Sequence, residues 1–192
     1  VLAFEPDLVL AGVFTTPATL DLLERVGRRV VRVPTASDIA GIHVAIRAVA
    51  EAVDERGRGE ALIAGLDARL RAAADGAKPS RQPSALVYQV NGLSAGPGSL
   101  ADELIKAAGL ANHASAVGLG SSGALPLELL AANPPDLVVL AGAADEYRTA
   151  VAENLRHPAL AAVLREHASV VVPWRYWLCG TQHGATAVES LA

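Results

Sequence analysis

Side chains suited to ligand binding are concentrated near the end of this 192-residue chain, in the run Trp174-Arg175-Tyr176-Trp177. Indole and phenol rings combine a broad apolar face with a polar edge, and a guanidinium supplies a fixed charge for an anionic group. The run follows the apolar segment 169–173, which is typical of a buried strand, and open α/β sheets bind ligands at the carboxyl ends of their strands. One interpretation is a ligand wall in which at least one ring faces a crevice. The other is that one or both tryptophans plug the core.

A glycine-rich turn from Asn91 to Ser99 separates a predicted strand from a predicted helix. Such a turn can present backbone N–H groups to an anion at the start of a helix. The turn matches neither Gly-x-Gly-x-x-Gly nor the phosphate-binding loop with its Lys-Ser/Thr ending, so it is a weak signal for a nucleotide enzyme. The structural alternative is a tight turn whose Ser99 caps the helix.

The chain offers no arrangement of side chains that is typical of an enzyme or of a metal site. Cys179 and His183 stand four positions apart, but no third orienting group is evident, and we favour a small buried cysteine. The five histidines, at positions 43, 113, 157, 167 and 183, have no metal-ligand spacing. The sequence therefore predicts no catalytic residues, no cofactor and no resident metal.

A repeated segment indicates how the chain is organised. Pro-Asp-Leu-Val-Leu-Ala-Gly at 6–12 returns, one valine longer, at 135–142. Each copy is typical of a buried strand that a Pro-Asp turn opens and a glycine closes. Two copies so far apart favour two similar α/β lobes with the ligand crevice between them. Phe14 and Thr15 follow the first strand and would form the first lobe's wall, although Thr16 could equally cap a helix.

The elements that would position these residues alternate between short strands and helices. We expect strands rich in Val and Leu at 7–11, 29–33, 84–90, 136–141 and 169–173. We expect helices at 19–26, 37–53, 60–75, 100–108, 145–155, 158–165 and 184–191. The βαβ order in both halves favours parallel sheets with right-handed crossovers.

The segment 60–75, between the two repeats, is predicted to form one long helix. Leu62, Leu66 and Leu70 give it a single narrow apolar stripe. It could be an ordinary surface helix, but its place midway between the repeats favours a rigid connection between lobes. The corresponding division is a first lobe at 1–57, an inter-lobe helix at 58–78 and a second lobe at 79–192.

Composition excludes several classes of function. With 52% hydrophobic residues the chain can bury a core and is not disordered. Its net charge of -4 and its lack of a basic stripe argue against nucleic-acid binding. No apolar run in the sequence is long enough to span a membrane, and the single cysteine, Cys179, cannot form an intrachain disulfide.

Four motifs carry a resemblance to a known family. They are the strand motif 5–11, the turn from Tyr88 to Ser99, the pair Leu127-Glu128 with the Pro-Asp motif 133–136, and the aromatic-plus-Cys-Gly segment 174–180. In order and spacing they resemble the class III solute-binding proteins of bacterial ABC importers, which capture ferric siderophores, haem and cobalamin. The resemblance covers nearly the whole chain. It implies an α/β fold of two Rossmann-like lobes with parallel sheets, joined by one long backbone helix.

The resemblance also implies a function. The protein would be no enzyme. It would bind a small-molecule metal chelate between its lobes and deliver it to the permease dimer of an ABC transporter. It would act as a monomer, in the periplasm or as a membrane-anchored lipoprotein. The ligand-binding residues would be Phe14, Thr15, Asn91, Gly92, Ser122, Trp174, Arg175, Tyr176 and Trp177. Glu128 matches the second-lobe glutamate that docks onto permease arginines in this family.

The resemblance leaves the ligand open. Aromatic residues with Arg175 favour a bulky, partly anionic chelate such as a siderophore or a corrinoid. Family members that hold haem use Tyr or His ligands; Tyr176 is a candidate, but no paired histidine is evident in the sequence. The alternative function is an enzyme on a chelatase-like or nucleotide-binding scaffold of two α/β lobes.

The first residues suggest that the first lobe lacks its beginning. The chain opens without Met, and only Val1 to Glu5 precede the first Pro-Asp copy, whereas an amphipathic helix at 127–133 precedes the second. We therefore expect an N-terminally truncated chain. The missing part would hold the first-lobe counterpart of Glu128 and any signal peptide or lipid anchor.

Overall fold

The first lobe is built on two parallel strands and the helix that connects them. The computed structural model describes residues 4–75, 81–142 and 150–192. Strand β1 (Leu8–Ala11) pairs in parallel with β2 (Arg29–Arg32), and α1 (Pro17–Arg25) lies between them in the chain. The Thr16 hydroxyl accepts a hydrogen bond from the Thr19 N–H (3.4 Å), so the interpretation of Thr16 as a helix cap is confirmed.

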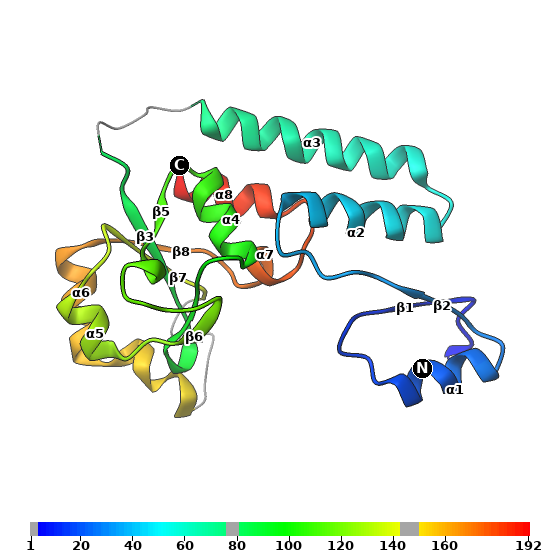
Figure 1. Cartoon of the computed structure of the whole chain (residues 1–192), viewed down its shortest axis with the longest axis horizontal. Coiled ribbons are helices and arrows are strands. Elements are labelled where there is room, and N and C mark those ends of the chain that lie inside the picture. Colours follow the sequence, from blue (N-terminus) through cyan, green and yellow to red (C-terminus); the bar gives the residue numbers. More distant parts are fainter. Residues whose placement is uncertain (1–3, 76–80, 143–149) are drawn as a thin grey trace.

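The second lobe holds a four-stranded parallel sheet in the order β5-β3-β7-β8 (Figure 1). Its strands are β3 (Ser84–Tyr88), β5 (Ala111–Asn112), β7 (Leu137–Leu140) and β8 (Ala168–Val171). Successive side chains of a strand point to opposite faces, so Ala85 and Val87 join one core while Leu86 and Tyr88 join another. The predicted parallel sheet, buried on both faces, is confirmed.

Helices cover both faces of this sheet. α4 (Leu100–Ala107) and α8 (Gly184–Leu191) contribute to the core that contains Val87. α5 (Leu127–Ala132) and α6 (Pro158–Glu166) contribute to the core that contains Leu86. None of the helices in the described part of the chain has the length and apolar character that crossing a bilayer needs.

Several short elements connect the strands of the second lobe. β4 (Leu93–Ala95) and β6 (Ser122–Ala124) form an antiparallel ribbon that the sequence does not predict. The others are the 3₁₀ helices η2 (Val90–Gly92), η3 (His113–Ser115) and η4 (Ala150–Arg156), and the one-turn helix α7 (Arg175–Leu178). The expected helix at 145–155 begins outside the described residues, and from Ala150 onward the chain forms η4.

Two long helices, α2 (Ile39–Ala52) and α3 (Arg56–Ala74), run alongside each other at the top of the view in Figure 1, and α3 extends from above the second lobe to above the first. The long helix predicted at 60–75 is confirmed as α3, which begins four residues earlier and includes Gly57 and Gly59. A Cβ on Gly59 would lie 2.5 Å from the Ala50 Cβ of α2, so glycine is needed here for the close approach of the two helices.

Helix α2 packs into the core of the second lobe. Its Ile42 is fully buried in the cluster that also holds Leu66 of α3 and Leu104 of α4. The sequence assigns α2 to the first lobe, yet its buried face is shared with the second. The domain boundaries at 57, 58–78 and 79 stay predictions.

The repeated Pro-Asp segments form equivalent strands in the two lobes, as the sequence predicts. β1 pairs with β2 in the same way as β7 pairs with β8. One further hydrogen bond extends each pair, from the Val33 N–H to the Ala11 carbonyl (2.8 Å) and from the Val172 N–H to the Leu140 carbonyl (2.9 Å). The carboxyl edge of the β1–β2 pair in the first lobe therefore corresponds to the carboxyl edge of the β7–β8 pair in the second lobe.

The second Pro-Asp turn also fastens two strands of its sheet together. The Asp136 carboxylate accepts hydrogen bonds from Arg81 (2.5 and 3.1 Å) and from the N–H (2.7 Å) and hydroxyl (2.8 Å) of Ser84, at the start of β3. Arg81, followed by the two Ser84 donors, holds the pKa of Asp136 well below its ordinary value. Asp7, the counterpart in the first copy, makes no hydrogen bond or ion pair within the described ranges.

Asp136→Asn is expected to lower the free energy of unfolding by about 1–2 kcal/mol at neutral pH, because an amide cannot match these charge-assisted hydrogen bonds. A lowered pKa means that the carboxylate stabilises the fold above its unfolded pKa of about 4, and that this stabilisation is lost as the pH drops through the folded pKa. The difference between the variant and the parent should therefore shrink at low pH. Urea unfolding at about pH 7 and about pH 3 measures both effects.

Asp7→Asn is the matched control for this experiment. The side chain of Asp7 has no partner in the described part of the chain, so its replacement should leave the unfolding midpoint unchanged. An equal loss of stability in the two variants would contradict the role given to Asp136.

Candidate ligand-binding site

A cavity lies at the carboxyl edge of β1 and β2 in the first lobe. It has a volume of about 440 Å³, and its lining includes Val13, Thr15, Arg32 and Pro34. Phe14, which lies between two of these residues in the chain, is 95% exposed. The Arg32 side chain makes no hydrogen bond or ion pair with the described residues. The cavity thus combines Thr15, which the sequence predicts as a ligand contact, with the guanidinium of Arg32, which it does not. The position of Arg32 at the end of a strand could have indicated it.

The segment predicted to form the second-lobe wall consists of α7 and the loop after it. The Trp174 N–H donates to the Ala141 carbonyl (2.7 Å), which fixes the start of α7 at the end of β7, and Trp174 is 45% exposed. The Arg175 guanidinium lies 4.8 Å from the centre of the Tyr176 ring and donates to its hydroxyl (3.4 Å). The centre of the His183 ring lies 6.0 Å from that of Tyr176. One short segment therefore presents an indole, a guanidinium, a phenol and an imidazole.

The structure corrects two expectations about residues 179–183. Cys179, expected to be buried, is exposed, because it lies where α7 ends and the chain turns toward α8. The sequence indicates no histidine partner for Tyr176, yet His183 stands beside it. A tight turn, with the Thr181 N–H donating to the Cys179 carbonyl (2.6 Å), brings them together, and spacing along the chain did not reveal it.

The two tryptophans have different places. Trp177 is only 3% exposed, and its indole N–H donates to the Val172 carbonyl (3.0 Å). It packs in the core beneath α7, whereas Trp174 is at the surface. The interpretation of a tryptophan in the core therefore applies to Trp177, and only Trp174 is exposed to meet a ligand. We do not retain Trp177 among the proposed ligand contacts.

Asn91 and Gly92 form the turn after β3, and both make internal contacts. Asn91 has a left-handed φ of 58°, and its N–H donates to the side chain of Asn154 (3.0 Å). Gly92 is buried, and a Cβ on it would lie 2.7 Å from the Leu125 carbonyl oxygen, so no other residue fits there. Asn91 is exposed, as is Ser122 of β6, and both stay candidate ligand contacts.

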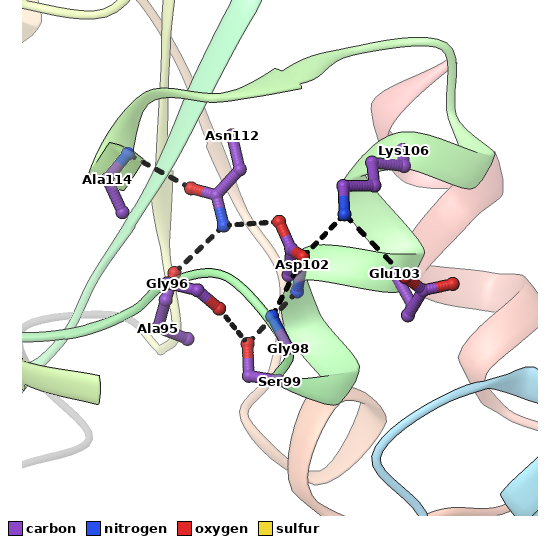
Figure 2. Close-up of polar contacts among 9 residues, drawn as sticks. All are labelled: Ala95, Gly96, Gly98, Ser99, Asp102, Glu103, Lys106, Asn112 and Ala114. Atoms are coloured by element: carbon purple, nitrogen blue, oxygen red, sulfur yellow. Dashed lines mark hydrogen bonds and ion pairs between the residues drawn. The ribbon is translucent and has the colours of Figure 1, made fainter. Parts of the chain in front are cut away.

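A buried carboxylate holds the glycine-rich turn in place (Figure 2). Asp102, which is 1% exposed, accepts hydrogen bonds from Lys106 (2.7 Å), from the side-chain amide of Asn112 (3.0 Å) and from the Gly98 N–H (3.1 Å). Burial by itself would raise the pKa of Asp102, but these three hydrogen bonds outweigh it and lower the pKa. Ser99 caps α4 by accepting the Asp102 N–H (3.2 Å), so the predicted cap is confirmed.

This arrangement argues against an anion site in the turn. The Gly98 N–H and the Lys106 ammonium, which could otherwise bind a phosphate, already donate to Asp102. The Asn112 side chain also donates to the Ala95 carbonyl (3.1 Å), so the turn is tied to β5 as well (Figure 2). A phosphate placed here would meet a buried carboxylate, and the nucleotide alternative loses its only sequence signal.

A second cavity, of about 410 Å³, lies between α2, α3 and the loop after α7. Aliphatic side chains such as Ile46, Val49 and Leu62 line it, and it meets the first-lobe cavity at Val33. Within the ranges 4–75, 81–142 and 150–192, no group of three or more His, Cys, Asp or Glu side chains is arranged to hold a metal ion.

Two α/β lobes joined by a long helix, each with exposed side chains at the carboxyl edge of its sheet, define a two-lobed binding protein. The sequence pattern of the periplasmic binding protein family matches residues 1–164, and the chain belongs to that family. The family is periplasmic, and its members are substrate-binding proteins. The chain is therefore a binding protein and not an enzyme.

Solved structures share this fold over nearly the whole chain. The periplasmic haem-binding protein RhuT from Roseiflexus sp. RS-1 is 25% identical with a TM-score of 0.81, and the match covers 99% of this chain and 75% of that one. The periplasmic haem-binding protein BhuT, solved with two haems, is 26% identical with a TM-score of 0.75 and the same coverage, 99% and 75%. An ABC-type Fe3+-hydroxamate transport system from Saccharomonospora viridis DSM 43017 is 23% identical with a TM-score of 0.73, covering 99% and 69%. No curated protein matches the chain.

Proposed function

We propose that this chain captures ferric haem between its two lobes and delivers it to the permease of an ABC importer. The observation that carries the proposal is the pairing of Tyr176 with His183, next to Arg175 and the exposed Trp174. Phenolate and imidazole are ligands of haem iron, an indole face packs on a flat macrocycle, and a guanidinium pairs with a carboxylate. Similarity to RhuT and BhuT, both named as haem-binding proteins, supports this choice.

The first-lobe cavity would supply the other surface of the site. Phe14 and Val13 offer exposed apolar area, and Thr15 adds a hydroxyl. Arg32 would pair with one propionate of haem and Arg175 with the other. We propose haem in place of the siderophore or corrinoid that the aromatic residues with Arg175 favoured, because His183 lies beside Tyr176 as the histidine partner that the sequence did not indicate.

Titration of the chain with haemin, a ferric trihydroxamate and cobalamin tests the class of ligand. Quenching of tryptophan emission reports binding, since Trp174 is exposed in the proposed wall. We expect haemin to bind at least about 10-fold more tightly than the other two, a difference of about 1.4 kcal/mol. Binding of the hydroxamate or of cobalamin, with no binding of haemin, would overturn the proposal.

Delivery to the permease is the second half of the proposed function. Glu128 is exposed in the first turn of α5, where it could form a charge-assisted pair with a permease arginine. The dimeric permease, the monomeric state of the chain and a lipid anchor stay predictions.

Glu128→Arg is expected to leave haemin affinity unchanged and to reduce haemin uptake about 10-fold, because an arginine would repel the docking arginine. Uptake is measured in cells that carry the cognate permease, and affinity on the purified chain. Glu166→Arg, at the exposed end of α6, makes the same change of charge on a different helix and serves as control. A parallel loss of affinity and uptake in Glu128→Arg would contradict the docking role.

A further inference from the structure

Two connections, one that follows β2 and one that follows α7, touch each other. Residues 33–38 lead from β2 to α2, and residues 179–183 lead from α7 to α8. Ala36 of the first connection is 6% exposed and packs against Gly180 of the second. A Cβ built on Gly180 would lie only 2.4 Å from the Ala36 Cβ, closer than real side chains approach. We call this the pivot contact.

Space, and not backbone conformation, requires the glycine at this contact. Gly180 is not among the residues with positive φ, so an alanine could adopt its backbone angles. Gly41 lies close to Ala36 on another side, where a Cβ built on Gly41 would be 3.0 Å from the Ala36 Cα, and a methyl side chain has no rotamer that could move it aside. A methyl group at position 180 therefore has to push the two connections apart.

Both ligand walls depend on these two connections. The first-lobe elements β1, α1 and β2 lie apart from the second lobe (Figure 1) and join it through residues 33–38. A hydrogen bond from Arg29 of β2 to the Ala52 carbonyl of α2 (3.0 Å) is a second tie. The other connection carries His183, whose ring lies beside Tyr176. A displacement at the pivot contact would therefore shift the first wall relative to the second.

We propose that the pivot contact sets the spacing of the two ligand walls, and that Gly180 is a positioning residue for ligand capture. The part that concerns affinity rests on the proposed haem function. The part that concerns spacing does not, because the distance between the lobes can be measured without ligand.

The test combines two substitutions, Gly180→Ala and Ala36→Gly, alone and together. Spin labels at Glu24→Cys in α1 and Arg165→Cys in α6, both exposed, report the distance between the lobes in a Cys179→Ser background. Gly180→Ala should shift the distance distribution by about 1–2 Å or more. Adding Ala36→Gly should restore it, because the nearest remaining atoms of residue 36 would lie 3.5 Å from the new methyl group, an ordinary contact.

Haemin affinity should follow the distance, falling about 10-fold in Gly180→Ala and returning in the double variant. Gly65→Ala is the matched control, since a Cβ at this exposed helical glycine meets nothing within 4 Å and should change neither readout.

An unchanged distance in a folded Gly180→Ala variant would overturn the proposal, as would a double variant that folds but does not recover the parent distance. If Gly180→Ala does not fold, the double variant must fold with the parent distance for the proposal to stand. If the distances behave as expected while no variant, nor the parent, binds haemin, the spacing role stands and the haem function is rejected.

Discussion

Replacing Tyr176 with Phe and His183 with Ala together is expected to weaken haemin binding about 100-fold, or about 2.7 kcal/mol. The double variant removes both side chains that could coordinate the iron in the second-lobe wall. It keeps the aromatic ring on which the Arg175 guanidinium lies, so the shape and charge of the wall are largely preserved. Each single variant then identifies the ligand, because loss of a coordinating atom changes the Soret and charge-transfer bands of the bound haem.

Tyr88→Phe is the matched control for this prediction. Tyr88 is 1% exposed in the core behind the sheet, so loss of its hydroxyl should leave the spectrum of bound haem unchanged. Unchanged affinity and spectrum in the double variant of Tyr176 and His183 would contradict the placement of the iron against this wall.

Asp102→Ala is expected to lower the free energy of unfolding by about 2–4 kcal/mol, the largest loss that we anticipate from a single substitution. The carboxylate is buried and accepts hydrogen bonds from Lys106, Asn112 and the Gly98 N–H, so its removal leaves the Asn112 amide and the Gly98 N–H without this acceptor. The turn that starts α4 would keep only one of its two described hydrogen bonds from Asn112 of β5, the one to the Ala95 carbonyl. Urea unfolding, followed by circular dichroism, measures the effect.

Glu103→Ala tests whether the effect is specific to the buried carboxylate. Glu103 is the next residue of α4, and its partly exposed carboxylate lies 3.7 Å from Lys106. Exposed pairs of this kind contribute about 0–1 kcal/mol, so the control should be close to the parent. Equal losses for Asp102→Ala and Glu103→Ala would show that the charge on α4 matters and the buried hydrogen bonds do not.

The strands and their pairing could be predicted because their signals are local. The Pro-Asp repeat marks β1 and β7 by composition alone, and the βαβ order of apolar segments indicates parallel pairing. The helix caps at Thr16 and Ser99 were likewise predictable, because a hydroxyl just before a helix has few other uses.

The details of the site depended on packing between distant segments, which the sequence does not display. Gly59 looks like a helix breaker, but it lies inside α3 because Ala50 of α2 needs the space. Trp174 and Trp177 have the same chemistry, and only the orientation of one helical turn sends one to the surface and the other to the core. The approach of His183 to Tyr176 depends on a tight turn whose shape no spacing rule specifies.

Titration of this chain with haemin, followed in the Soret region, tests haem capture most directly. We predict saturable binding of one haem per chain with a Kd of about 1 μM or tighter. Saturation should be accompanied by quenching of tryptophan emission, because Trp174 lies in the proposed wall. A Soret signal that grows in proportion to added haemin without saturating, with unchanged tryptophan emission, would contradict haem capture at this site.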